Sequence, residues 1–259
     1  MPNHIDYSSF DQPQILAFIF HPRQDWSTPP PGAIDYSVPV EEDVSISCRF
    51  YPLDESAPSI LYFHGNGEVV YDYDEIAMLY NGIGVNLFVA DYRGYGQSGG
   101  TPSFSNTASD AHGIFNFYRD TLRSSGYTGP LYIMGRSLGS FSAIELAWSY
   151  PQDWQGLIIE SGFTNVGRLV NYLSFFPSPG LSEELENSSM ERIRSITMPI
   201  LIIHGDYDTV IPYEQALLLF QHVGSEDRRL LTIPGAGHND LFMRGLNEYF
   251  SAIKDFTAR

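Results

Sequence analysis

The sequence predicts an α/β fold, in which a mostly parallel sheet is covered by helices on both faces. Short apolar segments rich in β-branched and aromatic residues alternate with helix-like segments along most of the 259-residue chain. Most of the later apolar segments are continuous rather than alternating, as is typical of strands buried on both faces. Hydrophobic residues make up 43% of the chain and charged residues 17%, a balance that excludes intrinsic disorder.

The expected elements follow one another in a regular order. Strands are expected at residues 15–20, 45–51, 59–63, 85–90, 131–134, 157–159, 200–203 and 229–233. Helices are expected at residues 68–80, 103–125, 138–149, 212–222 and 239–257. We therefore expect a single domain over residues 1–259.

Two segments depart from this alternation. Residues 1–32 are expected to form an N-terminal arm, because a Pro-rich stretch at 28–32 separates the first strand from the body. Residues 161–198 contain no strand pattern, and aromatic residues crowd together in their first half. We expect this second segment to form a small lid over the edge of the sheet.

Composition and charge exclude several classes of function. The chain has 31 Asp and Glu against 14 Lys and Arg, a net charge of −17, which disfavours binding to nucleic acids or anionic lipid surfaces. Its longest apolar run, 15–20, is far shorter than the ~20 residues of a membrane helix, so no membrane insertion is expected. The single cysteine, Cys48, excludes an intrachain disulfide and a thiolate metal cluster. The first residues lack the features of a signal peptide, which predicts a cytoplasmic protein.

The first chemistry-bearing motif lies between an expected strand and an expected helix. Residues 135–139 read Gly-Arg-Ser-Leu-Gly, the G-x-S-x-G pattern of a nucleophile on a tight strand-to-helix turn. Glycines two positions on either side of Ser137 are needed because the backbones pass closely there. The pattern predicts that Ser137 is a catalytic nucleophile.

A glycine-rich loop supplies the second motif. Residues 64–67 read His-Gly-Asn-Gly and follow the strand expected at 59–63. Acyl transfer needs two backbone N–H groups directed at the developing oxyanion. We expect these donors to be Leu138, directly after the nucleophile, and Asn66 in this loop. His64 is expected to be structural.

The acid and the base are expected in the last third of the chain. Asp206 and Asp208 both follow the strand at 200–203, and Asp208 is favoured because Asp206, next to a glycine, is expected to hold the turn. Among seven histidines only His238 lies in a glycine-flanked loop after the acid. The order Ser137, Asp208, His238 is the one expected when the nucleophile comes first and the base last.

A glycine pattern that suggests a nucleotide site is discounted. Residues 94–99 spell G-x-G-x-x-G after a strand, but no helix begins inside the motif. We therefore expect no NAD or FAD site.

Together the motifs resemble those of the α/β-hydrolase superfamily. The matching segments are 64–68 (HGNGE), 91–98 (DYRGYGQS), 135–140 (GRSLGS), 204–212 (HGDYDTVIP) and 235–240 (GAGHND). The resemblance is to the serine-hydrolase branch that includes the protein depalmitoylases and their bacterial relatives. It implies an eight-stranded sheet, a Ser–Asp–His triad, two backbone oxyanion donors, and neither cofactor nor metal.

The expected function is a carboxylesterase that cleaves small-molecule acyl esters through an acyl-enzyme on Ser137. The same groups also suit an acyl-protein or acyl thioesterase, or a peptidase or amidase, and a non-catalytic binding module is a more distant alternative. Aromatic residues of the lid are expected either to line an apolar substrate pocket or to pack the lid's own core: Phe163, Tyr172, Phe175 and Phe176. The sequence leaves a monomer and a weak dimer both open.

Overall fold

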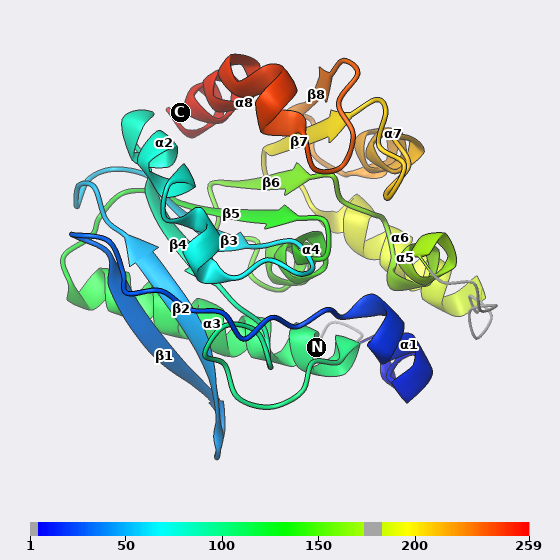
Figure 1. The fold of residues 1–259 in the computed structure, drawn as a ribbon. Helices are drawn as coiled ribbons and strands as arrows, with labels where there is room; N and C mark the ends of the chain where they lie inside the picture. Colours follow the sequence, from blue (N-terminus) through cyan, green and yellow to red (C-terminus); the bar gives the residue numbers. More distant parts are fainter. Residues whose placement is uncertain (1–4, 174–182, 259) are drawn as a thin grey trace.

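The computed structural model, which describes residues 5–173 and 183–258, contains a single eight-stranded sheet in that part of the chain. Its spatial order is β1-β2-β4-β3-β5-β6-β7-β8 (Figure 1). The strands are β1 (Ile34–Glu41), β2 (Val44–Tyr51), β3 (Ser59–Phe63), β4 (Asn86–Ala90), β5 (Leu131–Arg136), β6 (Gly156–Glu160), β7 (Ile200–Gly205) and β8 (Arg228–Ile233). Strand β2 pairs antiparallel with β1 and β4, and every other pair is parallel, which confirms the expected mostly parallel sheet.

Helices cover both faces of this sheet, as the sequence predicts. They are α1 (Pro13–Ile19), α2 (Ile76–Gly82), α3 (Phe104–Ser124), α4 (Gly139–Ser149), α5 (Val166–Leu173), α6 (Glu183–Ser195), α7 (Glu214–His222) and α8 (Leu241–Thr257), with short 3-10 helices η1 (Ser8–Phe10) and η2 (Val70–Tyr73). Helices α3 and α4 pack on one face, and α2 and α8 pack on the other.

Alternate residues of the central strands supply two separate cores. In β3, Leu61 and Phe63 point into the core under α3 and α4, whereas Ile60 and Tyr62 point into the core under α2 and α8. All four side chains are almost completely buried. Strand β3 is therefore apolar throughout because both of its faces are covered.

One expected strand is wrong, and one strand was missed. Residues 15–20 were expected as a strand, but 13–19 form helix α1, with Pro13 in its first turn and Ile15 and Ile19 buried one turn apart. Strand β1 was not predicted because it is a largely exposed edge strand that carries Pro39. The helix expected at 68–80 is divided into η2 and α2.

The fold brings several loops together at the carboxyl edge of the parallel strands. The loops that follow β3, β5, β6, β7 and β8 all leave the sheet at this edge. Figure 1 shows α1 and α5 on the side toward which the arrowheads of β5 and β6 point, and the two helices contact each other. Ligands of open α/β sheets bind at this edge, so a site is expected there.

Candidate active site

Ser137 occupies the tight turn between β5 and α4. Its φ angle is +50°, in the left-handed region that non-glycine residues rarely adopt. The flanking glycines are required by close contacts, because a Cβ at Gly135 would overlap the Gly139 carbonyl group and a Cβ at Gly139 would overlap the carbonyl group of Phe63. The packing thus explains the G-x-S-x-G pattern.

The structure brings Ser137, His238 and Asp208 into one hydrogen-bonded chain. His238 Nε2 lies 2.9 Å from Ser137 Oγ, and His238 Nδ1 lies 2.7 Å from Asp208 Oδ2. The three residues come from the loops after β5, β8 and β7. A serine hydroxyl, an imidazole and a carboxylate in this order can move a proton from the hydroxyl to the imidazole.

The carboxylate of Asp208 is held in place by several donors. Its Oδ1 accepts hydrogen bonds from the backbone N–H groups of Val210 and Ile211, both at 2.9 Å, and its Oδ2 also lies 3.3 Å from His204 Nε2. Burial opposes ionisation of Asp208, but the contacts with His204 and His238 outweigh it and hold the pKa well below the usual value. Asp208 therefore carries its negative charge at neutral pH.

The neighbouring Asp206 has a different role. Its side chain is exposed, and its Oδ1 accepts a hydrogen bond of 2.6 Å from the Gly235 N–H. Asp206 thus joins the loop after β7 to the loop that carries His238, and it does not contact His238 itself among the described contacts.

The backbone geometry orients the N–H groups of Asn66 and Leu138. The Gly65 carbonyl accepts hydrogen bonds from His64 Nδ1 at 2.8 Å and from the Glu68 N–H at 3.3 Å. The Ser137 carbonyl accepts hydrogen bonds from the Ser140 N–H at 3.0 Å and from Ser140 Oγ at 2.7 Å.

In a planar trans peptide the N–H points opposite to the preceding carbonyl. Because the chain contains no cis peptide bond in its described part, the Asn66 and Leu138 N–H groups point away from these occupied carbonyls. This orientation allows both groups to donate to an anion that lies on the side away from the carbonyls.

A buried ion pair supports the loop that contains Asn66. His64 Nε2 lies 3.0 Å from Asp91 Oδ1, and both side chains are inaccessible to solvent. Both ring nitrogens of His64 face oxygen acceptors, an arrangement that favours the protonated ring. Burial alone would lower the pKa of His64, but the hydrogen bond and negative charge of Asp91 raise it above the usual value. His64 therefore has the structural role that the sequence predicts.

A cavity of about 340 Å³ opens beside Ser137. Its apolar lining comes from Ala17 and Phe18 of α1, Leu173 at the end of α5, and Val210. The cavity also borders His238, so an acyl group placed there would lie next to both the hydroxyl and the imidazole.

Sequence reasoning missed the contribution of α1, because residues 15–20 were assigned to a strand away from the site. The signal was in the loop after β3, where Asn66 carries a side-chain amide that can both donate and accept hydrogen bonds. Asn66 Oδ1 accepts hydrogen bonds from the His21 N–H at 3.0 Å and from Tyr95 Oη at 2.6 Å, and Nδ2 donates to the Ile19 carbonyl. These bonds fasten the end of α1 over the cavity.

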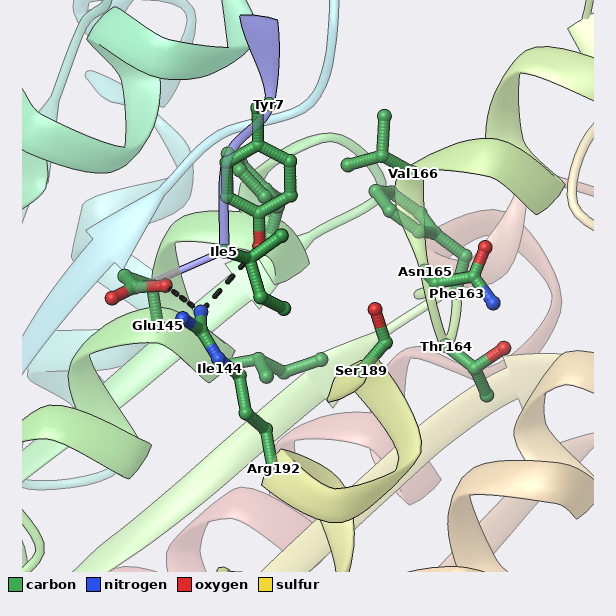
Figure 2. A pocket seen from close by; sticks show the side chains of 11 residues that line it. Ile5, Tyr7, Ile144, Glu145, Phe163, Thr164, Asn165, Val166, Ser189 and Arg192 are labelled. Carbon is green, nitrogen blue, oxygen red and sulfur yellow. Dashed lines mark hydrogen bonds and ion pairs between the residues drawn. The ribbon is translucent and has the colours of Figure 1, made fainter. Parts of the chain in front are cut away.

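The aromatic residues of the lid do not line this cavity in the described part of the chain. Phe163 is 1% exposed and borders a separate, smaller cavity together with Tyr7 and Arg192 (Figure 2). Tyr172 is exposed and its Oη accepts a hydrogen bond from Gln215. Phe175 and Phe176 lie outside the described residues. Phe163 and Tyr172 are therefore not among the residues that line the cavity beside Ser137, and the burial of Phe163 agrees with the other expected alternative, in which it packs against neighbouring side chains.

Known proteins are similar to this chain over most of its length. Residues 54–182 and 184–243 match the protein family described as serine aminopeptidase, S33. The chain is 30% identical over 210 residues to protein bem46 of Schizosaccharomyces pombe, covering 79% of this chain and 68% of that protein. It is also 30% identical over 220 residues to alpha/beta hydrolase domain-containing protein 17B of Homo sapiens, covering 83% of this chain and 71% of that protein.

A solved structure extends the comparison to the fold. The esterase Pf2001 of Pyrococcus furiosus superposes with a TM-score of 0.74 at 18% identity, covering 93% of this chain and 97% of the esterase. Within residues 5–173 and 183–258, no helix combines the length and the apolar character needed to cross a bilayer.

Proposed function

The chain belongs to the α/β-hydrolase superfamily, in the family described as serine aminopeptidase, S33, and on this basis we propose that it hydrolyses carboxylic esters through an acyl-enzyme on Ser137. The observation that carries the proposal is the hydrogen-bonded chain from Ser137 through His238 to Asp208 beside a cavity with apolar walls. The similarity to a solved esterase supports the same fold. In this proposal the reaction needs neither cofactor nor metal.

The first half of the reaction forms the acyl-enzyme. Ser137 Oγ attacks the acyl carbonyl carbon while His238 Nε2 takes the hydroxyl proton. Asp208, ionised and fixed by two backbone N–H groups, stabilises the resulting imidazolium. The Asn66 and Leu138 N–H groups donate to the oxyanion, and each such donor typically contributes ~2.7–4 kcal/mol to the transition state.

The second half releases the acyl group. The His238 imidazolium returns its proton to the leaving alcohol, and the C–O bond of the ester breaks. A water molecule then attacks the acyl-enzyme while His238 takes one of its protons, and the imidazolium gives this proton to Ser137 Oγ as the bond between Ser137 and the acyl carbon breaks and the carboxylic acid leaves. The acyl group occupies the cavity formed by α1, the end of α5 and Val210.

A peptidase is the second candidate, because the matching family is described as a serine aminopeptidase. Its chemistry uses the same three side chains and differs only in the leaving group, an amine instead of an alcohol. A thioester substrate would use them as well. The leaving group is thus what an experiment must decide.

The test combines a covalent probe with a panel of substrates. A fluorophosphonate probe is expected to label the wild-type protein and not Ser137→Ala. Among p-nitrophenyl acyl esters, acyl thioesters and aminoacyl anilides, the esters are expected to show the highest kcat/KM. Faster cleavage of the anilides would establish the peptidase instead, and an unlabelled wild-type protein with no turnover of the panel would contradict both.

A further inference from the structure

Arg136, the residue directly before Ser137, contacts three other segments of the site. Its Nε donates to Glu160 Oε1 at 3.0 Å, and its Nη1 donates to Glu68. Its Nη2 donates both to the His238 carbonyl oxygen and to Asn239 Oδ1, each at 2.9 Å. One guanidinium therefore joins the nucleophile turn to the loops after β3 and β8 and to the end of β6.

The contact with Glu68 reaches the oxyanion loop directly. Glu68 Oε2 accepts hydrogen bonds from the Gly65 N–H at 2.8 Å and from Tyr73 Oη at 2.7 Å. A Cβ at Gly65 would overlap Arg136 Nη1, so the loop lies against the guanidinium itself. The position of the Asn66 N–H depends on this packing, because Asn66 follows Gly65.

The contact with Glu160 ties the guanidinium to the strand beside Ser137. The Glu160 carbonyl accepts the Ser137 N–H at 2.8 Å, and Glu160 Oε2 accepts the Tyr249 hydroxyl at 2.6 Å. The side chains of Glu160 and Arg136 are 1% and 11% exposed. The left-handed turn at Ser137 is thus fastened on both sides of the nucleophile.

Stability alone does not account for this arrangement. Burial raises the pKa of Glu160 in spite of the nearby guanidinium, because burial disfavours the charged carboxylate. Buried ion pairs can often be replaced by apolar residues of similar volume without loss of stability, whereas they fix a single geometry. The forked guanidinium is suited to hold several acceptors in one plane, which an ammonium group cannot do.

We propose that Arg136 is a positioning residue for acyl transfer, which fixes the oxyanion loop and the His238 loop relative to Ser137. It acts through Asn66 and His238 and has no contact with the substrate carbonyl in this role. The inference rests on the proposed function, because the groups that it positions are those of the Ser137 mechanism.

The test measures two rates on folded protein. One is kcat for p-nitrophenyl butyrate, and the other is the rate constant for fluorophosphonate labelling of Ser137. Arg136→Met is expected to lower both by about 100-fold with little change in KM, because misplacement of reacting groups by ~1 Å costs that much. Asn239→Ala, which removes only one acceptor at an exposed position, is expected to lower both by about tenfold.

Arg93→Met is the matched control. The Arg93 side chain is 10% exposed, close to the 11% of Arg136, and it pairs with the two carboxylates of Asp110 and Glu41 away from the cavity. Arg93→Met is expected to have a lower melting temperature than wild type, while its kcat and its labelling rate constant stay unchanged. Both rates of Arg136→Lys are expected to lie between those of wild type and Arg136→Met. If Arg136→Met does not fold, the rates of Arg136→Lys and Asn239→Ala test the positioning role instead.

Two outcomes would contradict the inference. One concerns only the positioning role of Arg136, and the other also contradicts the proposed function. If the wild-type protein is labelled at Ser137 and the folded variants react at the wild-type rate, Arg136 has a structural role only. If the wild-type protein is neither labelled nor active on esters, the proposed function itself falls, and the positioning role falls with it.

Discussion

Two aspartates stand two positions apart in the loop after β7, and their surroundings give them different tasks. Asp208 is buried and holds His238 Nδ1, whereas Asp206 is exposed and holds the Gly235 N–H. The sequence favours Asp208 over Asp206 because Asp206 lies next to the glycine of the turn, and the contacts of the two side chains differ in the expected way. The additional support of Asp208 by His204 is a contact between side chains that no spacing rule reveals.

This difference predicts unequal effects of the same substitution. Asp208→Asn is expected to lower ester turnover by ~10³-fold or more, because an asparagine neither fixes the His238 tautomer nor stabilises the imidazolium. Ser137→Ala and His238→Ala are expected to have comparable effects. Steady-state kinetics on Asp206→Asn provide the control, with an expected loss far smaller than for Asp208→Asn. The reverse order of the two aspartate variants would show that the acid has been misassigned.

The buried His64–Asp91 pair predicts a stability that depends on pH. The folded state holds the His64 proton more tightly than the unfolded state, since the pKa of His64 is raised. The pair therefore contributes fully below the unfolded histidine pKa of ~6.5, and this contribution is lost as the pH rises through the folded pKa.

Urea unfolding of wild type and His64→Gln at several pH values between mildly acid and alkaline conditions measures this effect. The difference in the free energy of unfolding between the two proteins is expected to be largest at the acid end and to shrink toward the alkaline end. A difference that grows with pH would mean that His64 is neutral in the folded protein.

At the scale of elements, the central strands are the best predicted part of the fold. The expected strand at 59–63 has the same bounds as β3, because a run buried on both faces leaves a continuous apolar signal. The strand expected at residues 15–20 is wrong because such a continuous apolar run is ambiguous. Six apolar residues fit a short helix as well as a strand, and periodicity cannot separate a helix from a strand over this length. The position of α1 over the carboxyl edge of the sheet depends on contacts between distant segments, such as those of Asn66 with the end of α1. Such contacts leave no periodic pattern in the sequence.

The position of α1 predicts where acyl selectivity resides. Ala17→Trp would fill part of the cavity beside Ser137, so the ratio of kcat/KM for long against short p-nitrophenyl esters is expected to fall by ~10-fold. Phe163→Ala serves as the contrasting variant, because Phe163 borders the other cavity. It is expected to lower the free energy of unfolding by ~3–5 kcal/mol and to leave that ratio unchanged. A changed ratio in Phe163→Ala alone would restore the lid aromatics as the selectivity determinant.

At the scale of the whole molecule, the dominant feature is the charge of −17. A field of this sign lowers the concentration of anionic solutes near the surface, and salt screens it over a Debye length of about 10 Å at 0.1 M ionic strength. The chain folds with this excess because its buried carboxylates are paired, as in the contacts of Arg93 and Arg136.

The charge predicts a salt effect that depends on the substrate. For p-nitrophenyl hemisuccinate, kcat/KM is expected to rise by about threefold as ionic strength increases from low to physiological values. The neutral p-nitrophenyl butyrate is the matched reference and is expected to change little over the same range. Equal salt responses of the two esters would show that the surface field does not reach the site.

The way α1 is held has a consequence for how relatives of this protein could diverge. Ile15 and Ile19 anchor the helix in the core, while Ala17 and Phe18 face the cavity from the same seven residues. Mutations at these two cavity-facing positions leave every hydrogen bond among Ser137, His238 and Asp208 untouched. Selection for a new acyl group can therefore act on the codons of Ala17 and Phe18 without changing the groups proposed to react, and a directed-evolution library confined to these codons is expected to sample substrate range at little risk to activity.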